Sequence, residues 1–316
     1  MNPIVSAVIP THKRPILVQR AIRSALNQSY LNLEVIVVVD GPEPDTVKIL
    51  EAFEEPRLRI VELRQNVGPA EVRNIGVREA NGEWIAFLDD DDEWLPAKIE
   101  KQLNLLAYAD PRTNFIACRS QEVDSGIDKI IPRRFPRPGE DWSEYIFCSG
   151  GFLPVPGYLI KRELMLSVPF LNAAASFEDV DWLLRARAAN SLVPAWVDEA
   201  LVIYHNGSGD TIRVSHDPEW DRFYKWARSN RGILLTPKAF SYCLLTQGSQ
   251  RIKRSKGFTQ NFASLMYRAI SEGEIDFRFC LSLFFFAFLD VRSRSILRLI
   301  YERTRREVRA MAGIKR

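Results

Sequence analysis

Four consecutive aspartates, residues 89–92, are the most chemically distinctive group in the chain. Neighbouring carboxylates repel one another, so holding four together is costly unless a cation lies among them. Hard oxygen ligands favour Mg²⁺ or Mn²⁺, ions that keep some water and share substrate phosphates. The alternative is a solvated acidic loop that caps the next helix. The apolar residues 84–88 before the run and Trp94 after it favour a ligand site.

A second acidic group lies in the sequence Ser176-Phe-Glu178-Asp179-Val-Asp181, where a segment with helical spacing, residues 178–189, begins. A carboxylate there could take up a proton as a general base. The same spacing fits a capping box, in which Ser176 and Asp179 satisfy backbone N–H groups at the helix start. The positive end of a helix would also lower the pKa of such a carboxylate. The pattern alone leaves both interpretations open.

Polar residues follow the other apolar segments too. Residues 4–9 end at Pro10-Thr-His-Lys-Arg14 without a Gly-x-Gly-x-x-Gly pattern, which argues against a nicotinamide enzyme. Residues 34–39 end at Asp40-Gly41, which could bind a base or ribose or form a plain turn. Arg73 could face the same cleft or lie on the surface.

These residues need elements that bring them together. Segments rich in Val, Ile and Phe alternate with segments of helical spacing over the first 120 residues, which predicts an α/β protein with a mostly parallel sheet and helices on both faces. Such sheets bind ligands beyond the carboxyl ends of their strands. The predicted strands are residues 4–9, 34–39, 58–63, 84–88, 115–118, 158–160 and 200–204, and the predicted helices are residues 16–26, 45–53, 70–77, 97–106 and 178–189, with helical structure from residue 217 onward.

The composition is that of a globular protein, with 46% apolar and 26% charged residues among 316. The net charge of +3 hides a split, because residues 1–250 carry 28 basic and 34 acidic side chains and residues 251–316 carry 15 and 6. Four scattered cysteines lack disulfide or metal spacing. No signal-like start or bilayer-length apolar segment is present. We therefore expect a cytoplasmic protein.

Several motifs together resemble glycosyltransferase family 2 in order and spacing. The resemblance is close over residues 4–110 and looser to about residue 210. It implies the GT-A fold, a Rossmann-like, mostly parallel sheet flanked by helices. The motifs are Pro10-Thr11, Asp40-Gly41, Gly68-x-x-x-x-Arg73-Asn74-x-Gly76 and Phe87-Leu-Asp-Asp-Asp-Asp-x-Trp94.

The resemblance implies a catalytic domain over residues 1–215. Residues 1–120 would be its nucleotide-sugar-binding half and residues 121–215 its acceptor-binding half. Residues 216–316 would form a mainly helical, basic C-terminal extension.

The resemblance also assigns the donor site. Pro10, Thr11, Arg14 and Asp40 would hold the base and ribose, and Arg73 would lie beside the nucleotide. Asp89 and Asp91 would form the family's Asp-x-Asp pair, with Asp91 the direct ligand of Mn²⁺ or Mg²⁺ and Asp89 nearer the ribose. The register within four aspartates leaves Asp90 and Asp92 open, and Asp90 is placed with the nucleotide-sugar ligands. The cation would stabilise the charge that develops on the leaving diphosphate.

An inverting transfer needs one general base that takes the proton from the acceptor hydroxyl. By similarity to the family's Glu-Asp-x-Asp segment, Asp179 would be this base and Glu178 the second choice. His205, which precedes a Gly-rich loop, could reach the metal or diphosphate or could be structural.

The function implied is a metal-dependent, inverting glycosyltransferase of polysaccharide or cell-envelope biosynthesis. It would move a sugar from a UDP, GDP or dTDP donor to a hydroxyl of a glycan or lipid-linked acceptor. One alternative is a nucleotidyltransferase that makes an activated sugar, although the Gly-rich loop it needs after the first strand is missing. The other is a catalytically silent, glycan-binding relative.

The C-terminal region could serve a separate purpose. Residues 291–316 contain nine Lys or Arg and two Glu, and they follow the apolar residues 279–289. Such a region could make peripheral contact with the inner face of an anionic membrane. Alternatively, its phenylalanines could pack on the catalytic domain. No nucleic-acid motif accompanies the basic charge, so nucleic acid is not an expected partner.

Overall fold

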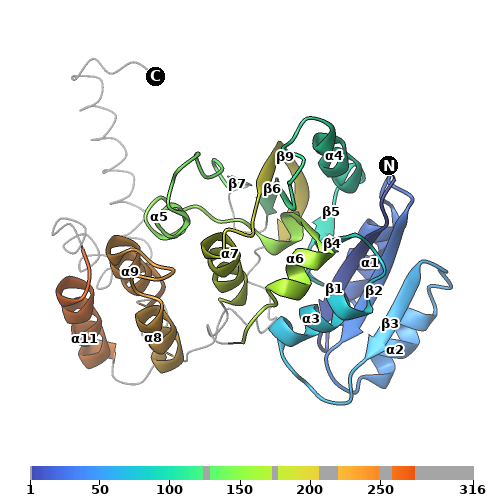
Figure 1. Cartoon of the computed structure of the whole chain (residues 1–316). Coiled ribbons are helices and arrows are strands. Elements are labelled where there is room, and N and C mark those ends of the chain that lie inside the picture. Colours follow the sequence, from blue (N-terminus) through green and yellow to red (C-terminus); the bar gives the residue numbers. More distant parts are fainter. Residues whose placement is uncertain (1, 124–128, 173–176, 206–219, 249–257, 275–316) are drawn as a thin grey trace.

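The computed structural model describes residues 2–123, 129–172, 177–205, 220–248 and 258–274 (Figure 1). Its strands are β1 (Val5–Thr11), β2 (Leu33–Val39), β3 (Leu58–Glu62), β4 (Trp84–Phe87), β5 (Glu93–Trp94), β6 (Phe115–Val123), β7 (Lys129–Ile131), β8 (Tyr158–Lys161) and β9 (Pro194–His205). Its α-helices are α1 (Leu17–Leu26), α2 (Pro44–Glu51), α3 (Pro69–Glu79), α4 (Lys98–Asn104), α5 (Trp142–Phe147), α6 (Arg162–Ser167), α7 (Glu178–Ala188), α8 (Trp220–Ser229), α9 (Pro237–Cys243) and α11 (Phe258–Ser271). The short helical turns are η1 (Leu105–Ala107), η2 (Val155–Gly157) and η4 (Leu244–Gly248).

The strands form one sheet in the order β3-β2-β1-β4-β8-β6-β9-β5, with β7 paired to β6. The first four strands of this order are parallel, as the alternating pattern predicted. Strand β8 runs antiparallel to both of its neighbours, whereas β6 and β9 are parallel to each other. The predicted α/β class with a mostly parallel sheet is therefore confirmed.

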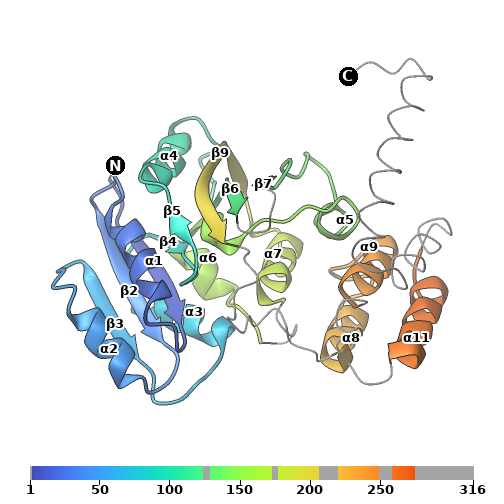
Figure 2. The same ribbon diagram turned by 180° about the vertical axis from the view of Figure 1, so that it is seen from behind.

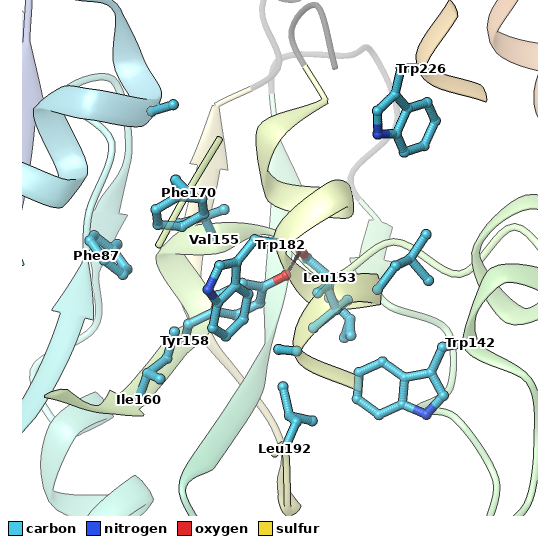
Figure 3. Packing of buried hydrophobic residues seen from close by; sticks show 14 of the residues in the cluster. Phe87, Trp142, Leu153, Val155, Tyr158, Ile160, Phe170, Trp182, Leu192 and Trp226 are labelled. Carbon is cyan, nitrogen blue, oxygen red and sulfur yellow. Dashed lines mark hydrogen bonds between the residues drawn. The ribbon is translucent and has the colours of Figure 1, made fainter. Parts of the chain in front are cut away.

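Helices cover both faces of the sheet (Figures 1 and 2). On one face, α1, α2 and α4 bury side chains such as Ile22, Leu50 and Ile99. On the other, α3, α6 and α7 pack around Trp182 of α7, which Figure 3 shows among its buried neighbours. Strand side chains alternate between these two clusters, so a strand buried on both faces is apolar at nearly every position.

Helices α8, α9 and α11 lie beyond α5 and α7 (Figure 1) and continue the second cluster. Trp226 of α8 donates a hydrogen bond from Nε1 to Asp181 Oδ1 of α7, at 2.8 Å. The rings of Phe177 and Phe223 meet edge to face, 5.6 Å apart. The predicted helical region after residue 217 is thus present where the structure describes it. The basic residues 291–316 lie outside the described residues.

Two short helices, α5 and α6, and the three-residue strand β7 are absent from the elements predicted from the sequence. Six-residue helices contain fewer than two turns, so their apolar spacing leaves no clear period. The cysteines at 118, 148 and 243 are free thiols. Within the described residues, every helix is too short or too polar to cross a membrane.

Candidate functional site

A pocket of about 490 Å³ opens where β1, β2 and β4 end. The carboxyl edge of a parallel sheet is where α/β proteins bind ligands. All the residues singled out from the sequence line this pocket, although the role of each stays a prediction. They are Pro10, Thr11, Arg14, Asp40, Arg73, Asp89, Asp90, Asp91, Glu178, Asp179 and His205.

Two members of the aspartate run, Asp90 and Asp92, are buried, with 5% and 1% of their surface exposed. Asp90 accepts hydrogen bonds from Thr11 Oγ1 and Arg14 Nη1, both at 2.8 Å. Burial raises the pKa of Asp90 to about 6. Asp92 Oδ1 accepts the backbone N–H of His205 at 2.9 Å. The run is therefore not the solvated loop of the alternative interpretation, and none of its carboxylates caps α4.

The side chains of Asp89 and Asp91 are the more accessible pair, 28% and 21% exposed. Asp89 Oδ1 lies 2.7 Å from Arg73 Nη2, and Asp91 Oδ2 lies 3.3 Å from Arg14 Nη1. Asp90 also lines the pocket, but it is buried and bound by Thr11 and Arg14, and Asp92 is buried as well. The greater exposure of Asp89 and Asp91 suits an Asp-x-Asp register of 89 and 91.

The donors around this pair fit an open divalent-cation site. Across the described parts of the chain, no three His, Cys, Asp or Glu side chains form a closed metal cage. Mg²⁺ and Mn²⁺ do not need one, since one or two carboxylates, water and substrate phosphates complete their shells. His205 lines the pocket, and its Nε2 lies 2.9 Å from Glu93 Oε1. Its role as a metal ligand remains a prediction.

Arg73 joins the aspartate run to α7. Its buried guanidinium bonds Asp89 through Nη2 and Glu178 Oε1 through Nη1, at 2.7 and 3.0 Å. It also lies over the ring of Phe170, 5.7 Å from the centroid. Helix α3 thus carries one cation that neutralises carboxylates from two distant parts of the sequence.

Helix α7 begins at Glu178, with Phe177 as its N-cap residue and no side chain capping it. Ser176 lies outside the described residues, and Asp179 Oδ1 accepts the N–H of its neighbour Val180 at 2.7 Å. The capping box considered from the sequence includes Ser176 and therefore lies outside the described residues. Burial, followed by the charge of Glu178, raises the pKa of Asp179 to about 7. This is the opposite of the lowering expected at a helix start.

Asp40 shapes the turn before α3. Its two carboxylate oxygens accept the N–H groups of Val67 and Gly68, at 2.7 and 3.0 Å. Gly68 has a φ of +84°, a conformation that favours glycine, and it is the N-cap of α3. A plain Asp-Gly turn therefore does not describe the whole role of Asp40, because its carboxylate also holds the turn before α3.

The sequence assigns no individual role to several other lining residues. One is His12, whose Nδ1 lies 2.9 Å from the Asp40 carbonyl and 3.0 Å from Glu43 Oε1. Glu43 also accepts the N–H of Lys13, at 2.8 Å, and so holds the loop after β1. The remaining residues, in the turn before α3, around η2 and at the end of β9, are Asn66, Gly68, Pro69, Val72, Phe152, Pro154, Val155, Pro156 and Tyr204. Gly68 belongs to the motif that contains Arg73. Residues 149–160 form a loop rich in glycine and proline that the resemblance places near acceptor contacts, although turn chemistry explains this loop equally well.

Comparison with solved structures finds this fold in two proteins that were solved in complex with nucleotide sugars. S. aureus TarS 1-349 in complex with UDP-GlcNAc superposes with a TM-score of 0.59 at 17% identity, over 85% of this chain and 88% of that chain. Mannosyltransferase PcManGT from Pyrobaculum calidifontis, in complex with GDP-Man and Mn²⁺, gives 0.57 at 18% identity, over 99% and 88%. At these identities the likeness establishes the fold alone.

Sequence relatives point the same way. An uncharacterized glycosyltransferase of Haemophilus influenzae is 31% identical over 201 residues, which are 63% of this chain and 67% of that protein. The putative teichuronic acid biosynthesis glycosyltransferase TuaG of Bacillus subtilis is 36% identical over 133 residues, 41% of this chain and 53% of that protein. The family model of glycosyl transferase family 2 matches residues 6–173, about half of the chain. The chain therefore belongs to glycosyl transferase family 2.

Proposed function

We propose that this protein is an inverting glycosyltransferase that moves a sugar from a nucleoside-diphosphate donor to a hydroxyl of a glycan or a lipid-linked glycan. The observation that carries the proposal is the single pocket that gathers the aspartate run, Arg73 and the two acidic residues of α7. Family membership favours this reading over the nucleotidyltransferase and the silent relative.

The charged lining suits a nucleoside diphosphate. Arg14 and Arg73 are cations within the pocket lining, and each already holds a carboxylate that a phosphate could replace. Asp89 and Asp91 would hold Mn²⁺ or Mg²⁺, which when bound supplies positive charge to the leaving diphosphate. PcManGT, whose complex contains GDP-Man and Mn²⁺, and TarS, whose complex contains UDP-GlcNAc, make both donor classes worth testing.

The two acidic residues of α7 differ in what they can do. Glu178 is bound by the Arg73 guanidinium, which already neutralises its negative charge. Asp179 accepts one N–H, and its raised pKa brings it close to neutral pH, where a general base works best. Asp179 is therefore the group that would take the proton from the acceptor hydroxyl as that oxygen attacks the anomeric carbon.

The type of acceptor is the least constrained part of the proposal. TuaG is assigned to teichuronic acid biosynthesis, which supports a glycan of the cell envelope as the acceptor. A panel of UDP-, GDP- and dTDP-sugars, tested by thermal shift with Mn²⁺ and with EDTA, would identify the donor, since a ligand that binds the native state raises its melting temperature. No shift with any donor would contradict the proposal.

The catalytic assignment has its own test. Asp179→Asn should reduce transfer by about 10³-fold, because general base catalysis contributes roughly 10² to 10⁴, while the nucleotide affinity stays close to that of the wild type. Asp198→Asn, which removes an exposed carboxylate of β9, is the matched control and should leave turnover unchanged. Full activity in the Asp179 variant would disprove its role as the base.

A further inference from the structure

The pocket has an apolar wall, formed by Phe152 and residues 154–156, which continues into η2 and β8. Two prolines stiffen this backbone, and Pro154 and Pro156 lack N–H groups that could anchor it. Its position must therefore be set largely through its carbonyl groups and its buried side chains.

Three side chains from one short stretch hold three successive carbonyls next to this wall. Trp94 Nε1 donates to the carbonyl of Pro156 at 2.9 Å. Gln102 Nε2 donates to that of Gly157 at 2.8 Å, and Lys98 Nζ to that of Tyr158 at 3.2 Å. Lys98 and Gln102 are four residues apart and lie on one face of α4. Trp94 comes from β5, shortly before this helix.

Lys98 is the unexpected member of this set. Its side chain is fully buried, and the contacts that the structure gives its ammonium group are the Tyr158 carbonyl and the ring of Trp94, 4.2 Å away. No carboxylate forms an ion pair with Lys98 within the described chain. A buried charge without an opposite charge costs stability. Burial disfavours the charged form of Lys98 and therefore lowers its pKa to about 8. An apolar residue would fill the same space at less cost.

The opposite side of the segment is equally constrained. Leu153, Val155 and Tyr158 insert into the cluster around Trp182 (Figure 3), and Tyr158 Oη donates to the Leu153 carbonyl at 2.7 Å. A Cβ at Gly157 would lie 3.0 Å from the Cys118 carbonyl oxygen, so the backbone lies tightly against β6.

The set of donors also begins directly after the aspartate run, and α4 follows β5 without a long loop. Trp94 is two residues beyond Asp92, whose carboxylate is tied to the backbone of His205. A shift of the aspartates would therefore be transmitted to the apolar wall through Trp94 and Lys98.

We propose that Lys98, together with Trp94 and Gln102, is a positioning residue that fixes the apolar wall relative to the aspartate run. The wall then meets a ligand bound at the aspartates in the geometry that transfer requires. This inference rests on the proposed glycosyl transfer for its activity readout, whereas the hold on the backbone can be tested without it.

The test compares Lys98→Met with Lys101→Met in the full chain. Lys101 lies on the same helix, but its side chain is 42% exposed and pairs with Glu199. In Lys98→Met, hydrogen exchange of residues 150–161 should become faster by about tenfold or more, and the protection that Mn²⁺ with UDP or GDP gives to these amides should disappear. The melting temperature should be equal to that of the wild type or higher, and kcat for transfer should fall by about tenfold, since positioning errors slow the chemical step. Lys101→Met should match the wild type in every measurement.

Each contrary result is decisive. Wild-type exchange in Lys98→Met would disprove the hold, whatever the activity. Faster exchange with unchanged kcat and unchanged nucleotide protection would show a structural contact only and would overturn the positioning role. An inactive wild type would contradict the proposed transfer. The hydrogen exchange rates and the nucleotide protection would still test whether Lys98 holds the apolar wall. If Lys98→Met does not fold, Trp94→Phe, which removes one N–H and keeps most of the ring, takes its place with the same expectations.

Discussion

The charged wall of the pocket, formed by Arg14, Arg73, Asp89, Asp91 and Glu178, is made of side chains that bind one another. The apolar wall is made of backbone that side chains of β5 and α4 hold in place. In the charged wall, a phosphate or a cation that binds can replace one member of an existing ion pair. In the apolar wall, nothing is free to exchange, because the donors and the carbonyls are buried. The pocket thus combines a wall whose ion pairs a ligand can exchange with a wall whose hydrogen bonds stay within the protein.

Asp91→Ala should give the largest effect, and it acts on the charged wall alone. Loss of the proposed metal ligand should abolish Mn²⁺-dependent turnover, by about 10³-fold or more if the cation stabilises the leaving group. Initial rates across a Mn²⁺ titration would measure it, with Asp198→Ala as the exposed control. Normal Mn²⁺ dependence in Asp91→Ala would move the metal ligand to another aspartate of the run.

Arg73→Met should have the largest effect on stability. It leaves Asp89 and Glu178 facing each other without their shared cation, and breaking a buried pair from one side costs about 3 kcal/mol or more in the free energy of unfolding. Urea denaturation would measure this cost. Arg78→Met, on the same helix but with a half-exposed side chain paired to Glu71, should cost less than about 1 kcal/mol. Similar losses in both variants would show that Arg73 does not bridge the two carboxylates.

Gly157→Ala shifts the comparison to the apolar wall. The added Cβ would lie 3.0 Å from the Cys118 carbonyl oxygen, and relieving this contact should cost about 1–2 kcal/mol and displace the wall. Transfer should slow while nucleotide affinity, set by the charged wall, remains. Calorimetric titration with nucleotide and Mn²⁺ separates the two effects, and a parallel loss of affinity would mean that the walls are not independent.

The smallest expected effect is a pH dependence that comes from Lys98. Its pKa is about 8 in the folded protein against an ordinary value of 10.5, so above pH 8 the unfolded chain binds more protons and stability rises with pH. Between pH 7.5 and 9 the gain should be about 1 kcal/mol. Cys118, whose pKa burial raises to about 11, acts in the opposite direction above pH 9, which sets the upper limit of this window. Urea denaturation of the wild type and Lys98→Met should show that the variant lacks this rise.

The charged wall could be predicted from the sequence because its chemistry lies in residue types. Four adjacent aspartates are informative even before a fold is known, and a strongly apolar strand indicates which edge they occupy. Arg73 alone could equally lie on the surface, and only the resemblance implies its place beside the nucleotide. The partners within the wall could not be predicted. Arg73 and Glu178 are 105 residues apart, and their pairing depends on how α3 and α7 pack.

For the apolar wall, the sequence indicates only a shaped loop over residues 149–160, which the resemblance places near acceptor contacts. The contacts that fix this wall could not be predicted. Phe152 and the prolines at 154 and 156 have residue types that are equally common in loops without function. What distinguishes this wall is the set of hydrogen bonds that its backbone carbonyls accept. Every residue has a backbone carbonyl, so the sequence does not indicate which ones are bound. Lys98 was read simply as part of a helix, because a lysine at a helix start is normally exposed. In the fold the longer strands and helices were recovered, whereas α5 and α6 depend on tertiary packing.

The hydrogen bond from Trp226 to Asp181 affects where this protein can be truncated or joined to a relative in a chimera. The segment that the family model recognises ends at residue 173, yet α7 starts five residues later and carries Trp182, which packs at the centre of the second cluster. Helix α8 in turn contacts α7 and its N-cap residue through Trp226 and Phe223. The recognised segment is therefore not a folding unit. A chimera that borrows C-terminal helices from a relative must bring along the matching face of α7, or the helix that presents Asp179 loses its support.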